Sequence, residues 1–279
     1  MVFYQYNIFF RKLQQFCNKF LDFLKNFVII VYSMKKILTL LIVSGVFLGC
    51  TVSLLTSCEP RRAPRSAISD YDYSDMDLSV QLAALNGDEE FLENRPVAVI
   101  TTCQGEIRLA LFPEFAPNTV AAFIARVQEG FYDDSEVLAI QDGVFFQAGT
   151  DSGGNIHPDV RENEYSVNMW PLRGAVGAYG TLQGASDSRF FIVHEQELAQ
   201  EEMARLREMK IDGENTLPEE LLDVFEEVGV AVTLSGFFTF FGQVISTQGF
   251  ETVEAIINVP ATRIGKPTQN IRIIKIELE

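Results

Sequence analysis

Apolar residues recur in short runs from Val97 onward, and turns rich in Gly, Ser and Asp separate the runs. Apolar and polar positions alternate in 97–101 and in 106–112, on either side of Gln104-Gly105, so these two runs predict a β-hairpin. Further strands are predicted at 137–140, 144–148, 174–179, 189–194, 237–245 and 270–278. Many short strands in about 180 residues favour a closed, mainly antiparallel barrel.

Two segments of this region have helical spacing instead. Pro117-Asn118 begins a predicted helix, and Gly130 is a typical helix-ending residue. The apolar stripe of this helix consists of Val120, Phe123, Ile124 and Val127. A shorter helix is predicted at 250–257. Residues 97–279 are therefore predicted to form one folded domain.

The segment Glu195–Gly229 interrupts this domain with an acidic stretch, 12 acidic side chains against three basic ones. Two helices are predicted in it, and the second begins at Pro218. Their apolar positions are Leu198, Met203, Leu206 and Met209 in the first helix and Leu221, Leu222 and Phe225 in the second. This helical insertion at 195–229 either packs on the domain or serves as a recognition element.

Residues 34–57 have the pattern of a secretory signal, because two lysines precede an uncharged run from Ile37 to Ser57. The run ends in Leu55-Thr56-Ser57-Cys58, which looks like a bacterial lipobox, the motif whose cysteine is lipidated. Phe47-Leu48-Gly49-Cys50 is a weaker candidate, since Phe is unusual at its first position. An uncleaved membrane anchor is the alternative, because about 20 apolar residues suffice to span a bilayer.

The segments on either side of the signal are not expected to belong to the fold. Residues 1–33 are cationic and rich in aromatic side chains. Either they extend the basic region of the signal or translation begins at Met34, which we favour. Residues 58–96 are predicted to be a tether, because Ser69–Asp75 is acidic and has no strand or helix period. Within the tether Leu78, Leu82 and Leu85 recur at helical spacing and predict a short helix lying against the domain.

Charge is divided unevenly along the chain, whose formal net charge is −16. Residues 1–57 hold six of the 22 basic side chains and one of the 38 acidic ones, so the remainder holds 16 basic and 37 acidic side chains. A surface this acidic repels nucleic acid and anionic lipid, so no nucleic-acid partner is expected. The charge serves solubility, or it offers an acidic face to a basic partner. With Cys58 acylated, Cys103 has no partner within the mature chain, and no disulfide framework is expected.

Four sequence blocks occur in a specific order, namely IRLALFPEFAPNTVAAFIARVQEGFYDD, RGAVGAYGTLQGASDSRFFIV, FFTFFGQVISTQGFETVEAI and NIRIIKIEL. Together they resemble the cyclophilin-type peptidyl-prolyl isomerases, and the resemblance covers nearly all of 97–279. It implies a mainly β fold: a closed eight-stranded antiparallel barrel capped by two helices, with a packed interior and a binding groove on its outer wall.

To catalyse prolyl isomerisation, that groove must lower the barrier to rotation about an X–Pro peptide bond. Rotation about a peptide bond has a barrier of about 18–20 kcal/mol, and uncatalysed X–Pro exchange takes tens to hundreds of seconds. Lowering the barrier needs an apolar pocket for the proline ring, anchors for the flanking backbone and a donor that favours loss of amide resonance. In the family an arginine supplies this donor. We therefore expect no cofactor and no metal.

The resemblance places the family's site on particular residues of this chain. The catalytic arginine is replaced by Ala139, the pocket phenylalanine before the glutamine by Val144, and the family's histidine by Phe238. Gln147 is kept, and Phe191 matches the floor of the proline pocket. We assign no catalytic residue. The predicted substrate-binding set is Val144, Phe145, Gln147, Tyr179, Gly180, Phe191, Leu234 and Phe238.

Several of these positions have a second interpretation. Arg189 could replace the lost arginine from a neighbouring strand, but we favour a surface salt bridge. Phe190 and Phe191 alternate faces, so at least one is expected in the core, and Gln147 is either in the groove or a solvated strand residue. The two histidines, His157 and His194, lack ligand-like spacing with cysteines or paired carboxylates and are expected to be ordinary polar residues.

These features predict a lipid-anchored peptidyl-prolyl isomerase of the bacterial cell envelope, facing the periplasm or the cell surface. We expect a monomer that assists the folding of proline-containing proteins with weakened activity. A catalytically silent cyclophilin-fold module that binds extended peptide is the alternative, and it is favoured by the missing Arg and His and by the missing Trp, which the resemblance places at Thr233. A third possibility is a cell-surface assembly protein that uses its acidic insertion.

Overall fold

The computed structural model describes residues 68, 71–141, 143–181, 183–194, 196–211 and 215–279, all within one compact unit. The predicted leader 1–57, the candidate lipidation site Cys58 and the start of the tether lie outside the described residues. None of the described helices has the length and apolar character that a membrane crossing requires.

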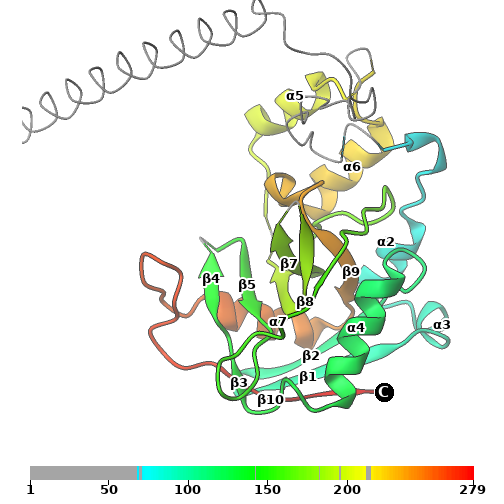
Figure 1. Ribbon diagram of the computed structural model, residues 1–279. Helices are drawn as coiled ribbons and strands as arrows, with labels where there is room; N and C mark the ends of the chain where they lie inside the picture. Colours follow the sequence, from blue (N-terminus) through cyan, green and yellow to red (C-terminus); the bar gives the residue numbers. More distant parts are fainter. Residues whose placement is uncertain (1–67, 69–70, 142, 182, 195, 212–214) are drawn as a thin grey trace, which may run out of the picture. The chain divides into compact units, whose positions relative to one another are not determined.

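Ten strands form one antiparallel sheet in the order β3-β10-β1-β2-β9-β7-β8-β5-β4, and β6 pairs with β8 (Figure 1). The strands are β1 (Val97–Thr102), β2 (Gly105–Leu111), β3 (Ser135–Glu136), β4 (Ala139–Gln141), β5 (Phe145–Ala148), β6 (Val160–Arg161), β7 (Ala175–Thr181), β8 (Gly184–Val193), β9 (Thr239–Val244) and β10 (Arg272–Leu278). The hairpin of β1 and β2 is confirmed. Strand β6 was not predicted, because its two residues show no apolar alternation.

The sheet curls, and its two edge strands belong to one chain segment, 135–141. Strand β3 pairs with β10, whereas β4 pairs with β5. The segment changes its hydrogen-bond partner between Val137 and Leu138. The backbone N–H of Val137 donates to the carbonyl of Ile271, whereas the backbone N–H of Leu138 donates to the carbonyl of Gln147. We predicted eight strands in a closed barrel; the structure instead has a curled ten-stranded sheet in which β3 and β4 do not pair with each other. The strand predicted at 137–140 corresponds to β4, and β3 before the bend was not predicted.

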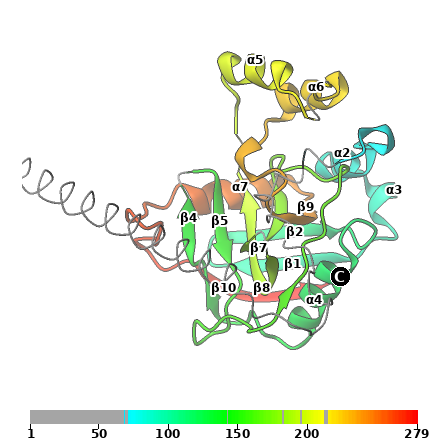
Figure 2. The same ribbon diagram turned by 45° about the horizontal axis from the view of Figure 1, so that its top comes forward.

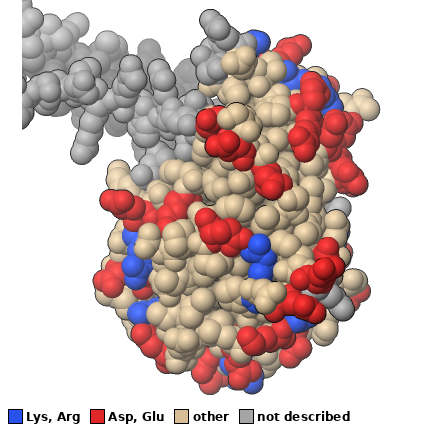
Figure 3. Space-filling model, turned by 90° about the vertical axis from the view of Figure 1, so that its right-hand side faces the viewer, with Lys and Arg blue, Asp and Glu red and all other residues tan. Residues whose placement is uncertain are grey.

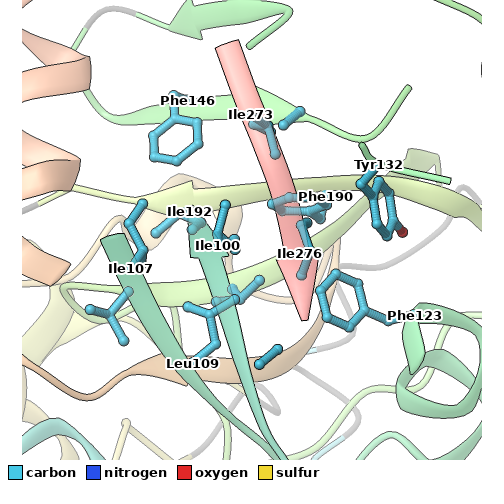
Figure 4. Packing of buried hydrophobic residues seen from close by; sticks show 14 of the residues in the cluster. Ile100, Ile107, Leu109, Phe123, Tyr132, Phe146, Phe190, Ile192, Ile273 and Ile276 are labelled. Carbon is cyan, nitrogen blue, oxygen red and sulfur yellow. The ribbon is translucent and has the colours of Figure 1, made fainter. Parts of the chain in front are cut away.

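Helices α4 (Pro117–Gln128) and α7 (Thr247–Ile257) pack on the curled sheet, as predicted. Phe123 of α4 lies 5.6 Å from Tyr132, 5.6 Å from Phe190 and 5.3 Å from Phe241, measured between ring centroids. Figure 4 shows Phe123, Tyr132 and Phe190 converging with isoleucines and with Leu109 from several strands. The interior is therefore filled by side chains, which leaves the outer face for binding.

The amino-terminal end of α4 is capped by a residue distant in sequence. The carboxylate of Glu164 accepts the backbone N–H groups of Asn118 at 3.0 Å and of Thr119 at 2.8 Å, and it also accepts both of their side chains. Partial burial opposes ionisation of Glu164, but these hydrogen bonds outweigh it and lower its pKa. An ionised carboxylate at this end also complements the helix dipole.

Residues 71–96 pack on the domain, in contrast to the predicted tether 58–96. The predicted helix is present as α2 (Ser79–Leu85), followed by α3 (Glu89–Leu92). The side chain of Gln81 is fully buried and exchanges hydrogen bonds with the backbone of Trp170, at 2.7 and 2.9 Å. Tyr71 and Tyr73 contact the same indole, with ring centroids 6.0 and 6.5 Å away. These ring contacts hold the segment on the domain, which its acidic composition did not indicate.

The insertion forms the two predicted helices, α5 (Gln200–Glu208) and α6 (Glu219–Val228). Their apolar faces build a separate cluster in which Phe225 lies 5.3 Å from Trp170. Arg207 of α5 ion-pairs with Glu219 and with Glu226 of α6, which ties the helices together. The helices lie at one end of the sheet (Figure 2), where acidic side chains gather on the surface (Figure 3).

Candidate functional site

A row of directly paired residues crosses four strand boundaries on the outer face of the sheet. Ala139 on β4 pairs with Gln147 on β5, and Gln147 pairs with Phe191 on β8. Phe191 pairs in turn with Gly177 on β7, and Gly177 with Phe240 on β9. Because paired residues of neighbouring strands point to the same face, this row places position 139, Gln147 and Phe191 on one surface.

Five rings form what we call the aromatic wall: Phe145, Tyr179, Phe191, Phe238 and Phe240. Phe191 lies at its centre, with centroid distances of 4.9 Å to Phe145, 5.0 Å to Phe238, 5.8 Å to Phe240 and 6.5 Å to Tyr179. Tyr179 and Phe238 stack on each other at 5.9 Å with their planes 29° apart. These two rings are half-buried, whereas Phe145, Phe191 and Phe240 are buried. The wall therefore presents Tyr179 and Phe238 to the solvent.

Phe191 packs closely against Gly177, which has no side chain. A Cβ built on Gly177 would lie only 2.3 Å from Cζ of Phe191, so the ring rests directly on the backbone of β7. Phe191 has 0% exposure. Phe190, the preceding residue, points to the opposite face and belongs to the interior cluster. The predicted alternation of the two phenylalanines is confirmed, although both are buried.

The remaining predicted residues lie in the same region. Val144 is half-buried and Leu234 buried, and both belong to the apolar cluster that contains the aromatic wall. Gly180 follows Tyr179 at an irregularity in the pairing of β7 with β8. Gln147 is 6% exposed, which excludes the solvated strand position that we considered for it. The structure thus places these residues in one region of the molecule, where Phe191 and Leu234 are buried, and their role in substrate binding stays a prediction.

The predicted salt bridge of Arg189 is wrong within the part of the chain that the structure describes. Its guanidinium carbon lies 4.6 Å from the ring centroid of Tyr179, over the face of that ring. The Nε atom is buried and has no hydrogen-bond partner among the described residues. A cation on an aromatic face is attracted by the ring quadrupole, and this contact replaces the expected carboxylate.

A buried carboxylate lies two residues before Arg189. The side chain of Asp187 is 0% exposed, ion-pairs with Arg161 and lies 3.8 Å from a guanidinium nitrogen of Arg126. Nδ1 of His157 lies 3.1 Å from Asp187 and 3.9 Å from Asp159. Sequence reasoning missed this group, because pairing of β6 with β8 brings together residues about thirty positions apart.

The same group corrects our interpretation of His157, which does face two carboxylates. The three ligand atoms are close enough together to hold a metal ion. However, two arginines contact the central carboxylate, and their charges oppose a cation at that point. The absence of a metal from this protein remains a prediction. His194 is half-buried, and its backbone N–H donates to the carbonyl of Val144.

Comparison with known proteins identifies relatives of this chain. The family model described as "Cyclophilin type peptidyl-prolyl cis-trans isomerase/CLD" matches residues 97–278. A protein of Staphylococcus aureus strain USA300, named "Putative peptidyl-prolyl cis-trans isomerase", is 30% identical over 186 residues, which are 65% of this chain and 90% of the relative. A Staphylococcus epidermidis protein of the same name is 28% identical over 196 residues, which are 68% of this chain and 95% of the relative.

Among solved structures, a cyclophilin type peptidyl-prolyl cis-trans isomerase of Cryptosporidium parvum, crystallised in the presence of the dipeptide ala-pro, aligns with a TM-score of 0.48. It is 21% identical in sequence, and the alignment covers 66% of this chain and 98% of that chain.

Proposed function

The chain belongs to the cyclophilin-type peptidyl-prolyl cis-trans isomerase family, and we propose that it binds proline-containing polypeptide segments at its aromatic wall and isomerises them slowly. The observation that carries this proposal is the paired row on the outer face. There Gln147 and Phe191 are neighbours, and position 139 directly faces Gln147.

The row and the aromatic wall beside it have separate functions in binding. The proline ring packs against the exposed edges of Tyr179 and Phe238, with Phe191 as the floor beneath them. The amide of Gln147 and the backbone of Tyr179-Gly180 hold the residues that flank the proline. Burying apolar surface stabilises such a complex by about 25 cal/mol per Å². The aromatic wall supplies this surface without a cofactor.

The slow rate follows from position 139. Alanine there has no donor for the amide nitrogen, and where no other side chain replaces it, losing one preorganised donor typically costs about 10²–10³ in rate. Val144 is smaller than the phenylalanine of the family, so one side of the pocket is thinner. Such losses need not add, because neighbouring residues couple.

A protease-coupled isomerisation assay on residues 59–279 tests this function, together with a fluorescence titration of the same proline peptide. We expect measurable binding and a rate far below that of an ordinary cyclophilin. Ala139→Arg should raise the rate, and more so beside Val144→Phe. A parent protein that fails to bind proline peptides would contradict the proposal.

One observation favours the second candidate, a catalytically silent peptide-binding module. Phe191 has no exposed surface, since Phe145, Tyr179 and Phe238 pack around it. A proline ring that reaches only the edges of the wall is held less deeply, and binding without rotation is then the expected outcome. Peptide binding with no isomerisation above the uncatalysed rate would select this candidate.

We further propose that Cys58 is acylated and anchors the protein as a lipoprotein in the bacterial envelope. The support is the signal pattern of residues 34–57 and the sequence Leu55–Cys58. An anchored isomerase would act on polypeptides outside the cytoplasm. The acidic insertion, as a recognition element, would suit the assembly of cell-surface proteins.

A further inference from the structure

We infer that Arg189 is the catalytic residue of this protein and supplies from β8 the donor that Ala139 on β4 lacks. The inference rests on the proposed isomerase function. It assigns to Arg189 a direct contact with the reacting amide, instead of the surface salt bridge that its sequence context indicates.

The position of Arg189 favours this role. It lies two residues before Phe191 on β8, where the pairing of β8 with β7 is irregular opposite Tyr179. Its guanidinium carbon lies 4.6 Å from the ring centroid of Tyr179, which belongs to the aromatic wall. Its backbone N–H donates to Oγ of Ser186 at 3.2 Å, which fixes the strand at this point.

The guanidinium of Arg189 is fixed by stacking. It lies 4.6 Å from the centroid of Tyr179, and Tyr179 stacks in turn on Phe238. A planar guanidinium on an aromatic face keeps its N–H groups free at its edge, because the ring occupies only its face. The donors are therefore held beside the two rings that contact the proline.

Arg189 has no carboxylate partner among the described residues, although the chain is strongly acidic. The nearest acid in sequence, Asp187, already binds Arg161 and lies near Arg126. One nitrogen of Arg189 is buried and unpaired. A buried donor without a partner costs free energy, so a structure keeps one only where another feature compensates. The donors available to a substrate amide at the aromatic wall are the terminal N–H groups of this half-buried side chain, whereas Nε holds no accessible position.

The reaction requires only a hydrogen bond from this group. Rotation about the X–Pro bond breaks no covalent bond and moves no proton. As the amide twists, its nitrogen becomes pyramidal, and the lone pair that resonance delocalises into the carbonyl of the planar amide becomes localised on the nitrogen. A hydrogen bond from the guanidinium to that lone pair exists only in the twisted state, so it lowers the barrier without tightening ground-state binding.

The test measures kcat and KM separately, by exchange spectroscopy of an X–Pro tetrapeptide with the full chain. Arg189→Ala should lower kcat about 100-fold and leave KM within about threefold. Arg189→Lys should retain part of the rate, because the ammonium donates but does not stack as a plane. Arg272→Ala, an exposed arginine on β10, is the matched control and should change neither value. Adding Ala139→Arg to Arg189→Ala should restore kcat.

The outcomes separate this inference from the proposed function. An active parent whose kcat is unchanged by Arg189→Ala overturns the role of Arg189 and leaves the isomerase function intact. A rise in KM at constant kcat also overturns it, since Arg189 would then only bind the peptide. A parent that binds peptide but does not isomerise it overturns both. If Arg189→Ala fails to fold, Arg189→Lys decides, and a rate equal to the parent's overturns the need for a stacked donor.

Discussion

Replacing Gly177 by alanine should displace the ring at the centre of the aromatic wall. The new Cβ would lie 2.3, 2.6 and 2.9 Å from three atoms of the Phe191 ring. The ring has no space to move into, because Phe145, Phe238 and Phe240 surround it with centroids 4.9 to 5.8 Å away. Either the ring tilts towards the solvent or β7 and β8 move apart.

The cost follows from two opposing effects. Overpacking a buried site costs about 1–3 kcal/mol. Replacing a glycine also restricts the unfolded chain, which stabilises the fold by about 0.4–1 kcal/mol. We therefore expect a net loss of about 1–2 kcal/mol. In a domain of this size such a loss lowers Tm by about 2–8 °C. Proline-peptide affinity should fall as well, since the floor of the site is displaced.

Urea unfolding of the parent, Gly177→Ala, Phe191→Leu and the double variant measures the coupling between the two positions. Leucine lacks the distal ring atoms that clash, so Gly177→Ala should cost little in the Phe191→Leu background. Gly153→Ala is the control, because its Cβ would meet only the side-chain ends of Asn155 and Asp151. Additive effects of the two substitutions would show that Phe191 does not rest on Gly177.

Three further predictions concern the core, the helix cap and the anchor. Phe123→Ala and Phe241→Ala should each cost about 3–5 kcal/mol in urea unfolding, and variants that unfold like the parent would contradict the packing of α4. Glu164→Ala should cost about 0.5–2 kcal/mol at pH 7. Because hydrogen bonds lower the pKa of Glu164, this difference should disappear as the pH falls through that pKa, and a difference that stays the same over the whole acid range would argue against capping by the ionised carboxylate. Cys58→Ala should abolish incorporation of labelled fatty acid; label that persists there but is lost in Cys50→Ala would assign the other cysteine.

The strands and helices were predictable because local pattern and tertiary environment agree in this chain. In β8 the alternation of Phe190 and Phe191 corresponds to two real surfaces, the interior and the aromatic wall. The proline and glycine at the ends of α4 bound that helix in the sequence and in the structure. The bend that separates β3 from β4 has no such signal, because the exchange of hydrogen-bond partners depends on β10 and β5.

Burial of polar and acidic segments was not predictable. Tyr71 and Tyr73 stand in an aperiodic acidic stretch that is typical of a tether, yet they pack on Trp170. The surface that receives them includes Phe225 of the insertion, about 150 positions further along the chain. Gln81 is buried for a related reason, since its partner is the backbone of Trp170. A polar side chain in a helix pattern does not reveal a distant hydrogen-bond partner.

The candidate site consists of buried residues, which we call its floor, and half-buried residues, which we call its rim. The floor gives information about the fold, and the rim gives information about activity. Phe191 and Gln147, which we aligned with retained residues of the family, are 0% and 6% exposed, so dense packing alone would keep such residues in place in a protein that had lost its activity. Ala139 and Phe238, which we aligned with substituted positions, are half-buried, as is Arg189. A half-buried residue contacts both the wall and any bound peptide, so its chemistry can change without disturbing the core. A residue retained at the floor therefore indicates the fold, whereas activity must be decided at the rim, where the guanidinium of Arg189 lies over the ring of Tyr179.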